Sequence, residues 1–162
     1  MAATSFDPRN PRLNSHYGIP QIVSDELEAN SQTFKAGELV YFNSGAVTVA
    51  TASTVIGGIA LADATNVSAS NATIPVQIVS PDDEIFMRCA SDASGTLALA
   101  TTFKTGQDYA VDATSNLWYA NSNDTSAGNV TFIAPVYDAS GASTYWGRFK
   151  VSYNKLNSTQ AG

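Results

Sequence analysis

The chain has 162 residues, which is enough for one domain with a sizeable core. Its charged fraction is 14 % and its formal net charge is −6, so the surface should be polar but weakly charged. A nucleic-acid-binding protein needs a basic face to neutralise phosphates, and this composition therefore argues against nucleic acid as a partner. No stretch has the length and apolar character of a signal peptide or a membrane span, which predicts no membrane partner.

The charge is unevenly distributed along the chain. Residues 36–144 carry ten acids against Arg88 and Lys104. The tail from Tyr145 onward has no acid and holds three bases, namely Arg148, Lys150 and Lys155. Two interpretations stay open: a solvated terminus, or electrostatic docking of that end on an acidic neighbour.

Residues 1–32 differ from the rest in composition. They contain Pro8, Pro11 and Pro20, many polar residues and only scattered apolar ones. Proline fixes φ and favours an extended residue before it, so this segment is predicted to be an extended arm with no strand or long helix. The acids after Ser24 would cap one or two helical turns that end by Asn30.

From Phe34 onward, short apolar runs rich in β-branched and aromatic residues alternate with turn residues, which is typical of an all-β sandwich or barrel. Asn43-Ser44-Gly45 is predicted to be a hairpin turn, and Gly57-Gly58 indicates a close backbone approach. A short helix over 93–102 is the one rival to strand structure. The predicted strands are 38–42, 46–51, 55–61, 73–79, 84–89, 97–103, 108–112, 116–120, 129–137 and 145–153.

A weak internal repeat accompanies this pattern. "FKAGELVYF" at 34–42 resembles "FKTGQDYAV" at 103–111, and each is followed by a turn and a second strand. "NATIPV" and "NVTFIAPV" form a looser match. We therefore expect a single β domain over 33–162, either built from two related units, 34–90 and 103–153, or carrying hairpins that converged in sequence.

The sequence offers little for catalysis or metal binding. His16 is the only histidine and Cys89 the only cysteine, so the common zinc and nucleophilic arrangements cannot be assembled within one chain. Cys89 lies in an apolar run and is predicted to be a small core residue. Asp82-Asp83-Glu84 would suit either a calcium site or, more simply, a turn after Pro81. We expect no enzyme activity, cofactor or metal; the enzyme alternative is a glycosidase that uses two of the aspartates.

Aromatic residues mark two segments, 116–122 and 143–153, each with Trp beside Tyr. Neighbours in a strand face opposite sides, so one ring of each pair should be buried and the other exposed. Exposed Trp and Tyr beside Arg are typical of protein contact surfaces, and such rings also form sugar-binding platforms.

The order of residues in 34–80 resembles the small β domain of the decoration (cement) proteins of tailed bacteriophage capsids. The resemblance is carried by Ala36-Gly37-Glu38-Leu39-Val40, the strand ending at Ala50-Thr51, and Ile56-Gly57-Gly58-Ile59-Ala60. It implies a β-tulip-like domain with an extended N-terminal arm, acting as a homotrimer on the capsid exterior after assembly from the host cytoplasm. Each subunit would bridge neighbouring major capsid proteins and stabilise the head.

Under this hypothesis two groups of residues form the contacts. The capsid-binding arm is expected to use Phe6, Arg9, Arg12, Leu13, Tyr17, Ile19 and Ile22. The trimer or capsid interface is expected to use Tyr145, Trp146 and Arg148. The alternative function is a head-fibre, tail-fibre or baseplate module that binds a receptor or carbohydrate.

Overall fold

The computed structural model describes residues 9–15, 18–66, 68, 72–126 and 128–152. Strands dominate these residues, and one short 3-10 helix, η1 (Ala100–Thr102), joins them. The strands are β1 (Arg12–Asn14), β2 (Ile22–Leu27), β3 (Leu39–Asn43), β4 (Ala46–Val49), β5 (Gly58–Ala60), β6 (Thr73–Ile78), β7 (Glu84–Ala90), β8 (Asp108–Thr114), β9 (Leu117–Asn121), β10 (Val130–Tyr137) and β11 (Ser143–Val151). The predicted all-β, sandwich- or barrel-like fold class is confirmed.

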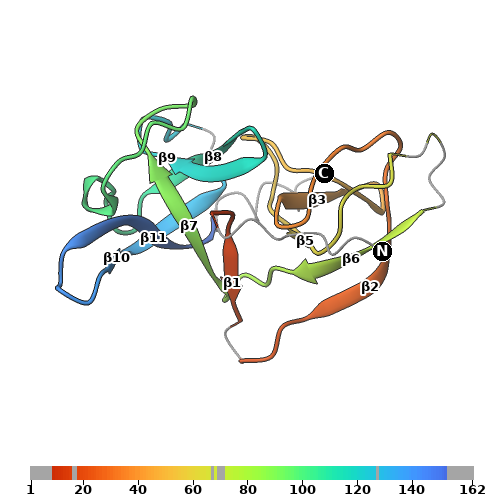
Figure 1. Ribbon diagram of the computed structural model, residues 1–162, viewed down its shortest axis with the longest axis horizontal. Helices are drawn as coiled ribbons and strands as arrows, with labels where there is room; N and C mark the ends of the chain where they lie inside the picture. Colours follow the sequence, from red (N-terminus) through yellow and green to blue (C-terminus); the bar gives the residue numbers. More distant parts are fainter. Residues whose placement is uncertain (1–8, 16–17, 67, 69–71, 127, 153–162) are drawn as a thin grey trace.

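Two sheets form a compact sandwich-like body, with one sheet at each end of its long axis (Figure 1). The first has the order β2-β6-β5-β3-β4, and the second has the order β1-β7-β11-β10-β8-β9. In the second sheet β7 also pairs with β9 in parallel, so five strands close into a ring. The first sheet closes at the corresponding place by one isolated parallel bridge, between Glu28 after β2 and Val47 of β4.

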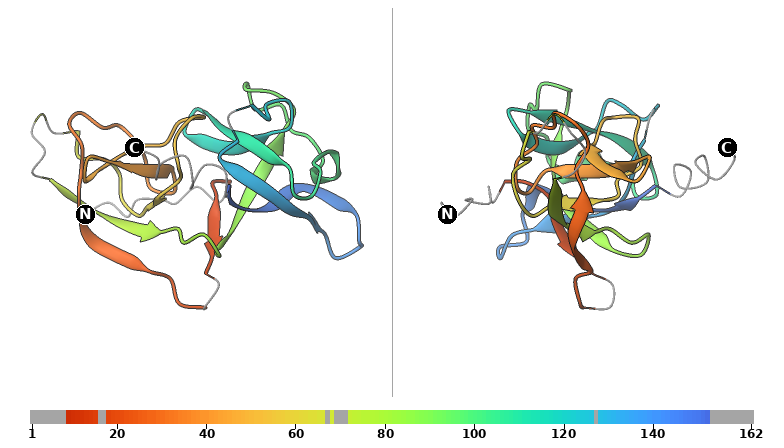
Figure 2. Two further views of the ribbon diagram at one scale, coloured as in Figure 1. Left: turned by 180° about the vertical axis from the view of Figure 1, so that it is seen from behind. Right: turned by 90° about the vertical axis from the view of Figure 1, so that its right-hand side faces the viewer.

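The two rings have the same strand order. The five strands from β2 to β6 occupy the same places in the first ring as the five strands from β7 to β11 occupy in the second, taken in sequence order. The parallel contact that closes each ring also corresponds: it joins β4 to the end of β2 in the first ring, and β9 to β7 in the second. Figure 2 shows the two rings as separate lobes with β1 between them. The structural units therefore run from β2 to β6 and from β7 to β11, whereas the sequence placed the units at 34–90 and 103–153.

Backbone hydrogen bonds recur at matching positions in the two rings. Gly37 N donates to Ala60 O at 2.8 Å, and Gly106 N donates to Phe132 O at 2.8 Å. Ala60 N donates to Glu38 O in the first ring, as Phe132 N donates to Gln107 O in the second. Likewise, Gly57 N donates to Val40 O in the first ring, and Asn129 N donates to Tyr109 O in the second. The "FKAG" and "FKTG" segments thus occupy equivalent places, one before β3 and one before β8. The looser match joins β6 with β10, which are not equivalent.

The larger of the two hydrophobic clusters includes residues of both rings. Leu39, Ile56 and Ile59 of the first ring pack in one buried cluster with residues of the second. Inside the second ring, Phe103, Tyr109, Phe132 and Phe149 pack with ring centroids 4.6–5.8 Å apart, in two tilted and two edge-to-face pairs. Their equivalents in the first ring are Phe34, Val40, Ala60 and Val76, which form a smaller separate cluster. Cys89 is fully buried, as predicted, and burial raises the pKa of its thiol to about 12.

Buried polar contacts also join the two rings. Trp118 Nε1 of β9 donates to Glu38 Oε1 at 3.0 Å, and both residues are buried. The other carboxylate oxygen of Glu38 accepts from the Lys35 backbone N–H at 2.6 Å. Asn129 is fully buried and donates to the carbonyls of Thr51 and Thr54. These bonds satisfy groups that would be costly to bury alone, so they fix one arrangement of the rings.

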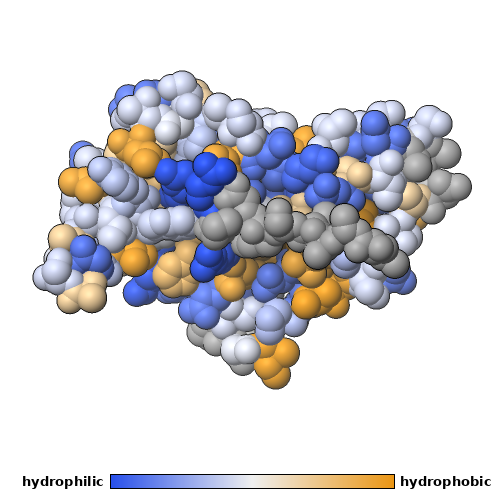
Figure 3. All heavy atoms as spheres, in the orientation of Figure 1, coloured by the Kyte–Doolittle hydropathy of each residue, from blue (hydrophilic) through white to orange (hydrophobic). Residues whose placement is uncertain are grey.

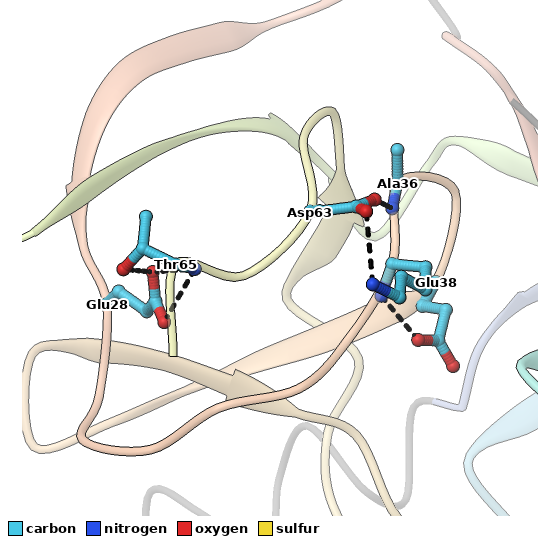
Figure 4. Close-up of polar contacts among 6 residues, drawn as sticks. Glu28, Ala36, Glu38, Asp63 and Thr65 are labelled. Carbon is cyan, nitrogen blue, oxygen red and sulfur yellow. Dashed lines mark hydrogen bonds and ion pairs between the residues drawn. The ribbon is translucent and has the colours of Figure 1, made fainter. Parts of the chain in front are cut away.

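The predicted absence of strands in the N-terminal arm is wrong, and so are the helical turns proposed after Ser24. β1 pairs with β7, and β2 pairs with β6. Sequence reasoning missed both because their residues are polar and flanked by prolines, so pairing with a partner strand overrides weak local preference. Where the arm ends, the buried Glu28 carboxylate accepts from Thr65 N and Thr65 Oγ1 (Figure 4). It also accepts from Asn66 N.

The connections confirm most of the predicted turns. Ser44 and Gly45 have φ values of 52° and 81°, as a two-residue hairpin turn of type I′ requires. A Cβ on Gly58 would lie 2.8 Å from Gln77 O, which confirms the close approach. The predicted strand 97–103 is wrong: Leu97 makes one isolated bridge with Ala90, and η1 follows.

Candidate interaction surface

The register of three strands defines an outer face of the second sheet. Arg12 of β1 pairs with Phe86 of β7, which pairs with Arg148 of β11. Paired residues project to the same side of a sheet. The neighbouring row, Leu13-Ile85-Phe149, faces the core, where Ile85 and Phe149 are fully buried. We call the opposite side the β1–β7–β11 face, and it consists of Arg12, Asn14, Glu84, Phe86, Arg88, Trp146 and Arg148.

A groove of about 650 Å³ lies on this face. It is lined by Arg12, Leu13, Asn14, Phe86, Val136 and Trp146. Residues from the N-terminal arm and from the last strand, which lie more than 130 positions apart in the sequence, therefore form one surface. β1 achieves this by pairing with β7, the central strand between the arm and β11.

The predicted interface residues differ in their surroundings. Tyr145 is 46 % exposed near the end of the β10–β11 hairpin, and Trp146 is half-buried in the groove. Arg148 Nη2 donates to Glu84 Oε1 at 3.0 Å. This ion pair is partly exposed, so it orients the guanidinium more than it stabilises the fold.

The predicted arm residues do not all lie on this surface. Arg12 lies on the β1–β7–β11 face, whereas Leu13 packs against the core and contributes only part of its side chain to the groove. Arg9 is exposed. Ile19 and Ile22 are 76 % and 56 % exposed; Ile22 begins β2, and Ile19 precedes it. The connection before β2 projects at the bottom of Figure 1, and Figure 3 shows hydrophobic atoms at the tip of this projection. Phe6, Tyr17 and His16 lie outside the described residues.

Sequence reasoning missed Phe86, Arg88, Asn14 and Val136. The signal for the first two was present in "EIFMRCA", where Ile85, Met87 and Cys89 are buried and the residues between them face outward. Asn14 and Val136 had no comparable signal, because their place in the groove depends on which strands pair.

The first aromatic pair contradicts the expectation of one exposed ring. Trp118 and Tyr119 are both buried, at 2 % and 4 % exposure. Trp118 faces the core, while the loop after β7 covers Tyr119 on the other side of β9. The Tyr119 hydroxyl donates to Ala93 O at 2.8 Å, and Gly95 lies directly against its ring.

The acids of "PDDE" (81–84) make different contacts, so they do not converge on one site. Asp83 is buried and accepts from Ser80 N at 2.8 Å, closing the turn, while Glu84 pairs with Arg148. Asp63, which lies outside this segment, accepts hydrogen bonds from Ala36 N and Lys35 Nζ (Figure 4). The hydrogen bond from Ala36 is the main cause that lowers the pKa of Asp63. Within the described ranges, no group of three or more His, Cys, Asp or Glu could hold a metal ion.

Comparison with known proteins identifies no relative, so the function has to be inferred from the fold and this surface. No family model, no curated protein and no solved structure matches the chain. The single helix in the described part of the chain is too short to cross a membrane. What defines the molecule is thus its class: an all-β protein with two rings of the same topology and an open, arginine-containing face.

Proposed function

We propose that this protein is a capsid decoration, or cement, protein of a tailed bacteriophage. It would bind the outside of the icosahedral shell as a homotrimer, bridge neighbouring major capsid protein subunits and stabilise the head. The proposal is for a structural binding protein and not an enzyme, located on the virion exterior after a period in the host cytoplasm.

The observation that carries this proposal is the groove on the β1–β7–β11 face. It unites Arg12 of the expected capsid-binding arm with Trp146 of the expected interface. Arg and Trp are the side chains most enriched among residues that dominate protein–protein binding energy. A partner would meet a surface held by a rigid body, because β7 and β11 below it are paired on both sides and packed on a buried core, and β1 pairs with β7.

A second observation supports the role of a cement protein. The two rings share a buried cluster and the Trp118–Glu38 hydrogen bond. Such a body resists relative movement of its halves, which suits a clamp between shell subunits. Repeated copies on one lattice would then strengthen each weak contact through multivalency.

The alternative function, a fibre or baseplate module, is favoured by one specific feature. Phe86 and Trp146 line the same open groove, and aromatic rings beside polar groups can stack on sugar rings. In that case the groove would hold carbohydrate instead of a protein segment.

The experiment that tests the proposal is co-sedimentation of the purified protein with expanded empty capsids of the phage whose genome encodes it. We expect saturable binding at a fixed number of copies per capsid protein, and capsids that withstand higher temperature when decorated. Binding to host cells or glycans, with no binding to shells, would contradict the proposal and support the fibre module.

A further inference from the structure

We infer that the β1–β7–β11 face binds an acidic segment of its protein partner, whose carboxylates meet the arginines while an apolar side chain enters the groove beside Trp146. This inference rests on the proposed function, since the shell protein is the expected source of the segment. It adds the chemistry of the partner.

The charge of the face is opposite to the charge of the molecule. Three arginines, Arg12, Arg88 and Arg148, share the face with a single described carboxylate, that of Glu84. The whole chain has a net charge of −6. A local positive surface on an acidic protein steers acidic partners to that place and repels them elsewhere.

Arg88 is half-buried on this face, where it lines a second, smaller pocket with Leu97 and Tyr119. It pairs in register with Trp146 on one side and Tyr119 on the other. In contrast with Arg148, no hydrogen bond or ion pair joins its guanidinium to another described residue. A planar guanidinium with unused donors matches a carboxylate by two parallel hydrogen bonds. The positive surface ends beyond Tyr119, where Asp112 follows in the same row.

Of the three arginines only Arg12 lines the groove, whose surface is mostly apolar. Leu13, Phe86, Val136 and Trp146 form most of its lining. A small anion or a phosphate chain would leave this apolar area exposed to water, whereas a peptide with both acidic and apolar side chains would cover it. The combination therefore favours a protein segment over nucleic acid.

The test uses the full-length protein and a synthetic probe, acetyl-Glu-Leu-Glu-Phe-Glu-Leu-Glu-amide. Binding is followed by calorimetry and by the fluorescence of Trp146, because the buried Trp118 should report little change. We expect the probe to bind, and to bind more weakly as salt is added. The same peptide with Lys in place of every Glu should not bind.

Two variants, Arg88→Glu and the milder Arg88→Gln, test whether the probe binds on this face. We expect Arg88→Glu to weaken probe binding about tenfold or more, and Arg88→Gln to weaken it less. Lys104→Glu is the matched control, since it makes the same charge change at an exposed residue before β8, and it should bind as the unaltered protein does. Thermal melting verifies that each variant is folded.

Three results would overturn the inference: no binding of the acidic probe, equal weakening by Lys104→Glu, or equally tight binding of heparin or DNA. Concentration-dependent self-association that Arg88→Glu abolishes would also overturn it, because the face would then join copies of this chain. The proposed function is tested separately. Shell binding that Arg88→Glu leaves unchanged refutes this inference alone, whereas probe binding without shell binding refutes the shell as the source.

Discussion

Trp118 and Trp146 are the two tryptophans of the chain, and their surroundings give them different roles. Trp118 is buried between the rings and donates to the carboxylate of Glu38. Trp146 is half-buried and lines a groove open to solvent. The first residue should therefore matter for stability and the second for binding.

Trp118→Phe tests this division. The substitution removes the hydrogen-bond donor to Glu38 Oε1 and leaves a space in the core, so we expect the free energy of unfolding to fall by about 2–4 kcal/mol. Denaturant unfolding measures this change. Trp146→Phe is the matched control and should lower the free energy of unfolding by about 1 kcal/mol or less. Equal losses for the two variants would show that Trp118 has no special structural role.

At the scale of the elements, the two rings use the same kind of hairpin. β3 and β4 are joined by Ser44-Gly45, and β8 and β9 are joined by Ser115-Asn116, all with φ between 52° and 81°. Positive φ at both turn positions matches the twist of the flanking strands. Serine is not the best residue for this conformation, since Asn tolerates it more readily.

Ser44→Asn should consequently stabilise the protein. It creates the Asn-Gly turn that two-residue hairpins prefer, and we expect the free energy of unfolding to rise by about 0.5–1 kcal/mol. Ser24→Asn in β2 serves as the control, because Ser24 is not among the residues with positive φ and should gain nothing. A fall in the melting temperature of Ser44→Asn would contradict the assigned turn.

The sequence predicted a strand well when the strand's own residue pattern specifies it, and poorly when the strand depends on pairing with distant partners. Strands such as β3, β4 and β7 alternate apolar and polar residues, so their own pattern specifies them. β1 and β2 depend instead on partner strands that are distant in sequence. The segment 97–103 has strand-like composition, but only Leu97 finds a partner there.

The same distinction explains the candidate surface. The aromatic pair beside an arginine was enough to predict Trp146 and Arg148 as contact residues, and Arg12 was predicted because it lies in the N-terminal arm. That these residues share one face follows only from the pairing of β1 with β7. For the same reason Leu13 was selected as a contact residue although its row faces the core.

At the scale of the whole molecule, the two rings form one body. Their shared core and their buried polar contacts favour joint unfolding. The arm contributes to both sheets, because β1 joins the second and β2 joins the first. A molecule of this kind presents its face at a fixed orientation, which is what the proposed clamp between shell subunits would require.

Electron cryomicroscopy of expanded capsids saturated with the protein tests the proposed shell binding directly. We predict trimers on the outer surface near the local threefold axes of the shell, each with the β1–β7–β11 face against a capsid protein. Bare shells under saturating protein, or density confined to a fibre or baseplate, would contradict it.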